Sequence, residues 1–300
     1  MSNLNIDTEF QKLAVKTQFQ SDLGLTRYKM DRGDREYNNS YYNSIIMNGG
    51  DDDDSNSPAT NTKRTAGLPN STRTGGINRI TFPTPDGVGY TFYITSSSTN
   101  DTSTGTGARK LYIDGLNADW DRMNEEITLT GRTSVATTKT NWLRINKMFV
   151  SDVGTGSTND GDIFVSTVDD ATLGVPQTNI VSVIQLGYGY TTLGIFSVPR
   201  FHRLYFTRGS YYCNTGESKP LHNTQFSTYP WGGSSAPNDK RIRLLVGGLY
   251  NSKPVAYETG GSAPEFPCTD IEFLIFTETG TTVNYSIFWN TVIIRDVKNF

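Results

Sequence analysis

The side chains of this chain that could act as catalytic bases or nucleophiles are few and poorly spaced. The 300 residues include two histidines, His202 and His222, and two cysteines, Cys213 and Cys268. A serine hydrolase triad would need one of the histidines, but the sequence has no Gly-x-Ser-x-Gly motif and His202 lies in a strand-like segment. A surface or half-buried strand histidine is the favoured interpretation. We therefore expect no catalytic triad and no enzymatic activity.

Two pairs of neighbouring carboxylates indicate a second chemistry, the hydrolysis of glycosides. Asp119 and Asp121 flank Trp120, and Glu125 adjoins Glu126. A glycosidase holds two carboxyl groups roughly 5–10 Å apart across a sugar cleft. Adjacent residues of a strand point to opposite faces, and a solvated turn explains the two pairs equally well. A polysaccharide-degrading enzyme is the weakest of the functions considered.

The sequence also lacks the patterns of metal and phosphate sites. Structural zinc needs about four ligands, and the two cysteines form no Cys-x-x-Cys pair, so we expect no metal and no cofactor. Four consecutive aspartates at 51–54 lack the alternate spacing of a calcium loop and indicate a charged tether. The glycine-rich segment 153–161 has no P-loop lysine and is typical of a hairpin loop. Cys213 and Cys268 are expected to be free thiols, with one disulfide as the alternative.

The composition favours strands over helices and constrains the partners. Hydrophobic residues make up 35% of the chain and charged residues 19%, and it has 29 glycines, 16 tyrosines and 15 phenylalanines. Aromatic and β-branched residues suit pleated surfaces, whereas Gly, Asn and Ser suit turns. A net charge of −3 provides no basic field for nucleic acid, and no run approaches the ~20 apolar residues of a membrane span. We expect an all-β protein with no specific nucleic-acid partner and no membrane span.

Residues 1–75 are predicted to form an extended N-terminal arm. Apolar residues at helical spacing predict a short helix near its start. The residues of the arm that we expect to contact a neighbouring subunit are Phe10, Leu13, Ala14 and Phe19. A flexible acidic and polar hinge follows, because residues 49–76 cannot bury enough apolar surface to become ordered. Such an arm more often contacts a neighbouring subunit than stabilises its own domain.

Residues 76–300 show the two-residue period of about a dozen short strands. No helical pattern alternates with them, which predicts an antiparallel β-sandwich or barrel in one domain. Two tandem small sandwiches, divided near Gly174–Thr178, are the alternative. The polar stretch 214–239 interrupts the strands, and its Tyr229 and Trp231 are predicted to lie in an exposed aromatic loop.

Nine short segments between about residues 85 and 296 combine turns with the first residues of strands. They are Leu116–Asp121, Glu126–Gly131, Trp142–Met148, Asn159–Ile163, Gly187–Thr191, Phe196–Pro199, Arg241–Val246, Glu265–Glu272 and Val283–Ile294. Together they resemble a virion protein family of large DNA viruses of algae and of marine tailed phages. The resemblance implies a capsid or other virion component with a jelly-roll type of β-sandwich, assembled in a host or bacterial cytoplasm. It brings no catalytic residues.

The sequence therefore predicts a non-enzymatic viral structural protein, either a minor capsid, a vertex (penton) or a decoration protein. Its expected partners are further copies of itself and other capsid proteins, contacted through the sandwich and the arm. Short sheet edges and many loops allow identical copies to tile a surface, and an arm that orders on assembly couples folding to binding. The alternative is the receptor- or glycan-binding head of a viral fibre or tail, with Tyr229 and Trp231 on a host glycan.

Overall fold

The computed structural model describes residues 35–50, 64–65, 67–69, 73–214, 222–231, 241–247, 255–257, 267–277 and 284–296. These residues form strands β1 to β16 and contain no helix, and every strand pairing is antiparallel. The prediction of an all-β antiparallel sandwich is confirmed. The predicted N-terminal helix, with Phe10, Leu13, Ala14 and Phe19, lies outside the described residues.

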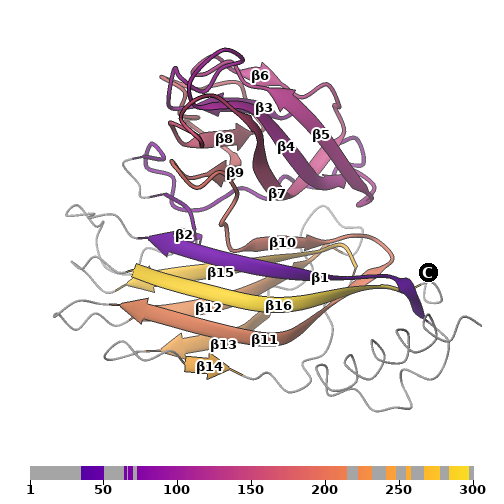
Figure 1. Ribbon diagram of the computed structural model, residues 1–300. Coiled ribbons are helices and arrows are strands. Elements are labelled where there is room, and N and C mark those ends of the chain that lie inside the picture. Colours follow the sequence, from indigo (N-terminus) through magenta and orange to yellow (C-terminus); the bar gives the residue numbers. More distant parts are fainter. Residues whose placement is uncertain are drawn as a thin grey trace, which may run out of the picture.

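Two of the four sheets form a large sandwich, which is the lower body in Figure 1. The first sheet has the strand order β1 (Arg35–Gly50), β16 (Asn284–Asp296), β11 (His202–Asn214) and β14 (Val255–Tyr257). The second sheet has the order β10 (Ile195–Val198), β15 (Thr269–Thr277), β12 (His222–Pro230) and β13 (Arg241–Gly247), with β2 (Arg64–Thr65) also paired to β15.

The strand order of this sandwich is that of a jelly roll. β10 and β2 both pair with the edge of β15 that β12 leaves open, so they act as two pieces of one strand. Counted in this way, eight strands follow one another along the chain, with the order 1-8-3-6 in one sheet and 2-7-4-5 in the other. Eight strands in two interlocked Greek keys define the jelly roll.

The remaining strands form a second sandwich, inserted between β2 and β10. One of its sheets has the order β6 (Val135–Ala136), β3 (Tyr93–Ser96), β8 (Ile163–Ser166) and β9 (Ile180–Ile184). The other has the order β5 (Arg122–Thr128), β4 (Ala108–Asn117) and β7 (Trp142–Val153). Figure 1 shows this inserted sandwich standing on the jelly roll on the side of β10. The two sandwiches are therefore nested, whereas the sequence predicted a single domain or a tandem pair.

Two strands fall inside the range 1–75 that the sequence predicts as an arm. β1 pairs with β16 from Arg35, opposite Asp296, to Gly50, opposite Asn284. β2 pairs with β15 in the other sheet. Tyr and Ile in the segment 41–47 favour strands, but the Asn and Ser residues between them obscure any two-residue period. Strands before and after residue 75 thus pair in the same sheets. The expected domain boundary near residue 75 therefore does not separate two structural units.

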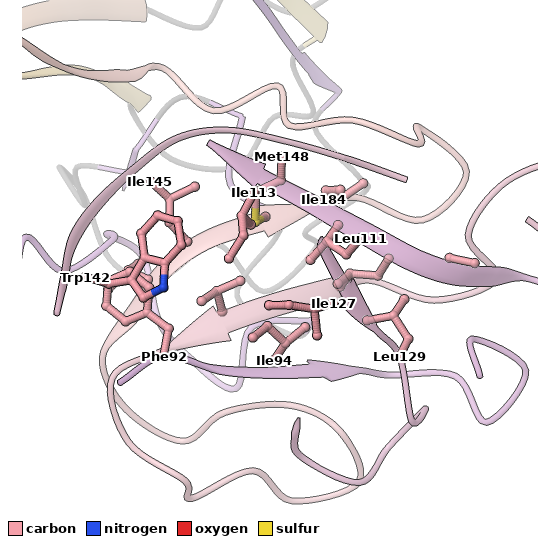
Figure 2. Packing of buried hydrophobic residues seen from close by; sticks show 14 residues of the cluster. Phe92, Ile94, Leu111, Ile113, Ile127, Leu129, Trp142, Ile145, Met148 and Ile184 are labelled. Carbon is pink, nitrogen blue, oxygen red and sulfur yellow. The ribbon is translucent and has the colours of Figure 1, made fainter. Parts of the chain in front are cut away.

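The inserted sandwich has its own hydrophobic core, shown in Figure 2. Alternate residues of facing strands supply it, as expected for two sheets packed face to face. Trp142 is wholly buried and stacks on Phe92, with ring centroids 6.0 Å apart. The labelled residues in the figure are Phe92, Ile94, Leu111, Ile113, Ile127, Leu129, Trp142, Ile145, Met148 and Ile184. This separate core indicates that the insertion is a folding unit rather than a long loop.

A second apolar cluster joins the insertion to the two chain segments that connect it to the jelly roll. Phe164 and Ile180 face away from the main core and pack with Leu68 and Leu193 from the two connections. The connections run side by side, because a Cβ added to Gly67 would lie 2.2 Å from the backbone oxygen of Thr192. Both ends of the insertion are therefore fixed at one place.

Buried Asp101 holds the loops at one end of the inserted sandwich. Its Oδ1 accepts hydrogen bonds from the backbone N–H groups of Ala108 (2.7 Å) and Asp160 (2.9 Å). Its Oδ2 accepts from the Gly161 N–H (3.0 Å) and the Ser96 hydroxyl. One carboxylate thus holds together two loops, the Ser- and Thr-rich 96–107 and the Gly-rich 153–161.

Candidate functional site

The most distinctive polar cluster among the described residues lies where the two sandwiches meet. Arg144 of β7, in the insertion, is 3% exposed, and Asp270 of β15, in the jelly roll, is wholly buried. The Arg144 Nε donates to Asp270 Oδ1 over 2.9 Å, and Nη2 donates to Oδ2 over 2.7 Å. Such a two-point ion pair fixes both distance and orientation, so it sets how the sandwiches are joined.

Aromatic rings and carbonyl groups surround the Arg144 guanidinium. Its Nη1 donates to the backbone oxygens of Pro83 (2.6 Å) and Leu143 (2.8 Å). The rings of Trp120, Trp231 and Phe82 lie 5.2, 5.4 and 5.5 Å from the guanidinium carbon. Negative ring faces attract a cation most strongly where water is excluded.

The Asp270 carboxylate accepts hydrogen bonds from three separate parts of the chain. It accepts hydrogen bonds from the Ser197 hydroxyl of β10 and from the indole N–H of Trp231, in addition to Arg144. A buried carboxylate is tolerated only when it is paired and hydrogen-bonded, and this one is both. The cluster therefore joins the insertion to three segments of the jelly roll, namely β15, β10 and the residue that follows β12.

A second buried carboxylate, Glu272, lies two residues further along β15. It accepts hydrogen bonds from the Thr65 hydroxyl of β2 (2.8 Å) and from the Tyr229 hydroxyl (3.0 Å), and it forms an ion pair with Arg79. Burial, and then the negative charge of Glu272, raise the pKa of Tyr229 to about 12. Asp270 and Glu272 thus give one strand of the jelly roll two polar attachments to the chain around the insertion.

The prediction that Tyr229 and Trp231 lie in an exposed aromatic loop is wrong. Tyr229 lies in β12 and is half-buried, and Trp231 directly after it is only 6% exposed. Trp231 packs with Leu116 and Trp120 of the insertion. The glycines that follow Trp231 suggested a solvated turn, but the neighbouring sandwich covers the indole. This residue belongs to the junction and is not free to bind a glycan.

The other residues considered for chemistry are separate from one another. Asp121 pairs with Arg200, and Glu125 accepts hydrogen bonds from the Thr138 backbone N–H and hydroxyl, both at 2.7 Å. His202 lies in β11, and Cys268 is a free thiol whose pKa burial raises to about 11. Within the described ranges, no three His, Cys, Asp or Glu residues gather as metal ligands, and no helix could span a membrane.

Sequence analysis did not identify the junction residues. A signal was present, since Arg144 interrupts the apolar segment 142–145, and Asp270 and Glu272 alternate with Ile271 and Phe273. Charged residues on strands that are apolar on both sides indicate a buried pair. Their partners are far away in the sequence, and only the fold reveals them.

Comparisons with known proteins give little beyond this geometry. No family model matches the chain, and a search of curated proteins finds no similar sequence. Among solved structures, it is similar to infectious bursal disease virus, Gt strain, with 9% identity and a TM-score of 0.22 over 70% of this chain. This chain spans 56% of the length of that one. The Gx strain of the same virus gives 9% identity and a TM-score of 0.23, covering 87% of this chain and 73% of the other. TM-scores this low carry no argument about function.

Proposed function

We propose that the chain is a non-enzymatic structural component of a virus particle. In this proposal the jelly roll is the building block of the shell, and the inserted sandwich stands on it. The observation that carries the proposal is the jelly-roll strand order 1-8-3-6 and 2-7-4-5, because double-sheet jelly rolls are a recurrent architecture of viral capsid domains. The resemblance of several segments to virion proteins of algal viruses and marine phages supports the same role.

The nested arrangement suits a shell protein with a fixed projection. An insertion that is connected at one place and held by the Arg144–Asp270 pair keeps a constant orientation on the jelly roll. A constant orientation matters when many identical copies must tile a closed surface, since each interface repeats the same geometry. The junction cluster then has a mechanical role and performs no chemistry.

Self-association through a sheet edge forms part of the proposal. β1 is 16 residues long and, among the described strands, has a neighbour on one side only. Its sequence has no charged residue after Arg35 and Glu36 and no proline. Long edge strands without charges or prolines pair readily with another chain. We assign to the protein a place as minor capsid, vertex or decoration subunit that contacts copies of itself and other capsid proteins.

Assembly of the purified full-length chain tests this proposal. Native mass spectrometry and analytical ultracentrifugation over a range of concentrations should show a discrete oligomer. Negative-stain electron microscopy should show rings or shells, and the chain should be detected in purified virions by mass spectrometry. A strictly monomeric protein that is absent from virions would overturn the proposal.

A further inference from the structure

Aromatic residues form a row across the outward face of the sheet β5-β4-β7. Tyr112 of β4 is paired with Glu126 of β5 on one side and with Phe149 of β7 on the other. Phe149 in turn forms an antiparallel bridge with Tyr190, in the segment that runs beside β7. Directly paired residues of neighbouring strands lie on the same face of a sheet. The row Glu126, Tyr112, Phe149 and Tyr190 therefore crosses four adjacent segments.

The burial of the neighbouring residues shows that this row faces away from the core. Leu111 and Ile113, on either side of Tyr112 in β4, are wholly buried in the core of the insertion. Tyr112 and Phe149 are half-buried, with ring centroids 4.9 Å apart and planes inclined at 30°. Tyr190 is 42% exposed. Three rings on one solvent-facing surface are unusual, because exposed aromatic residues normally occur singly.

Cationic, anionic and hydroxyl groups border the aromatic row. The Lys147 ammonium lies 5.3 Å from the centre of the Phe149 ring. Glu126 accepts hydrogen bonds from the Ser151 hydroxyl (2.8 Å) and the Lys110 ammonium (3.0 Å), and these bonds lower its pKa. Beside the row, Asp114 of β4 is paired in register with Lys147. The surface thus offers donors and acceptors around an apolar strip.

From this arrangement we infer that the row binds a neutral oligosaccharide. The apolar C–H face of a pyranose ring packs on aromatic rings, whose faces are negative, while its hydroxyl groups need both donors and acceptors at the edges. Tyr112, Phe149 and Tyr190 supply the apolar strip. The Glu126 carboxylate accepts hydrogen bonds from sugar hydroxyl groups, and the Lys147 ammonium donates hydrogen bonds to them. A chain of hexoses laid across the strands would meet each ring in turn.

The charge pattern selects this ligand over a nucleic acid or a protein. Glu126 is paired with Lys110 and Asp114 with Arg122, so these cations are neutralised and do not form the basic patch that binds a phosphate backbone. The core of a protein interface is depleted in charged residues, whereas here Lys147 and Glu126 adjoin the rings themselves. The inference does not depend on the proposed shell role, because a subunit of a particle can have a glycan-binding site or lack one. It also differs from the predicted Tyr229–Trp231 loop, which is covered.

Glycan binding by the full-length chain tests the inference. The probes are neutral hexasaccharides of glucose, mannose and galactose, with sialylated and sulfated oligosaccharides alongside, measured on an array and then by calorimetry. We expect saturable binding to at least one neutral probe. Tyr112→Ala and Tyr190→Ala should each weaken it at least about tenfold, which corresponds to about 1.4 kcal/mol. Tyr112→Phe keeps the ring and should retain most of the affinity.

Matched controls separate a binding role from a structural one. Leu173→Ser changes an apolar side chain that is 72% exposed on another loop, and it should leave binding unchanged. Circular dichroism and thermal unfolding should show that Tyr190→Ala is folded as the unmodified chain is. Binding only to charged glycans, no binding to any probe, or full affinity in both alanine variants would overturn the inference.

Discussion

Arg144 and Asp270 lie 126 positions apart in the sequence and meet in a two-point ion pair. One residue belongs to the inserted sandwich and the other to the jelly roll, so a single buried pair joins two separately packed bodies. Removing one member of such a pair leaves an uncompensated charge in the interior, which costs more than the pair itself contributes. Changing one member alone should therefore destabilise the junction more than changing both members together.

Replacing Arg144 with Met should lower the free energy of unfolding by about 3–5 kcal/mol, because the Asp270 carboxylate then stays buried without its cation. The double variant Arg144→Met/Asp270→Leu removes both charges and should regain much of the loss. Urea unfolding followed by tryptophan fluorescence, to which Trp120 and Trp231 beside the pair contribute, measures both effects.

The exposed pair between Arg122 and Asp114 is the matched control for this experiment. Its Arg122 side chain is 51% exposed, and surface ion pairs contribute about 0–1 kcal/mol. Arg122→Gln should therefore change the unfolding free energy by less than about 1 kcal/mol. Equal losses for Arg144→Met and Arg122→Gln would contradict the burial of the junction pair.

The second prediction concerns Trp231, which the sequence placed in an exposed loop. Trp231→Ala should destabilise the protein by about 3–5 kcal/mol, because it empties a buried site between the sandwiches. Trp231→Phe should cost less, since a ring remains to fill part of the site, although the hydrogen bond to Asp270 and some buried volume are lost. An exposed tryptophan would change stability by no more than about 0.5 kcal/mol. Denaturant unfolding of the two variants decides between these placements.

The all-β, antiparallel class could be predicted because it depends on local information, whereas the jelly-roll type is implied by the resemblance to virion proteins. Alternation over a few residues marks a strand, and segments such as Trp142–Met148 show it clearly. The nesting could not be predicted, because β2 consists of two residues and shows no period at all. That β2 and β10 share one edge of β15 is a relation between segments far apart in the sequence, which no local pattern contains.

The candidate site was missed for a related reason. Trp231 directly follows the end of β12 at Pro230, and the sequence predicts it to be exposed. Its indole is covered by the other sandwich, which is a matter of tertiary packing. Likewise, Arg144 stands out as a charge among apolar neighbours, but its partner on β15 cannot be identified before the sheets are placed.

The third prediction concerns Asp101, which binds the loops of the inserted sandwich. Asp101→Asn replaces one acceptor oxygen by an NH₂ group that would face backbone N–H donors, so at least one buried donor loses its partner. The expected loss of stability is about 1–3 kcal/mol. Hydrogen–deuterium exchange should accelerate in segments 96–107 and 153–161. Unchanged exchange in both loops would show that Asp101 does not hold them together.

The last prediction concerns the pH dependence of stability at Tyr229. Its pKa is about 12 in the native state against an ordinary 10.0, because burial and Glu272 disfavour the phenolate. The native state thus holds this proton more tightly than the unfolded chain does. Its contribution is fully present below pH 10.0 and is lost as the pH rises towards about 12. The free energy of unfolding should therefore fall across this range, and that of the Tyr229→Phe variant should fall less.

The pKa of Cys268 shifts in the same direction, from 9.0 to about 11, so the comparison is best made in a Cys268→Ala background. Urea unfolding at a series of pH values measures the slopes, and tyrosinate absorbance follows the ionisation directly. In that background, the difference in slope between the protein that keeps Tyr229 and its Tyr229→Phe variant isolates the Tyr229 hydroxyl, which bonds to Glu272. Identical slopes in the two proteins would mean that Tyr229 ionises equally easily in the native and unfolded states, and thus that its hydroxyl is not buried against β15.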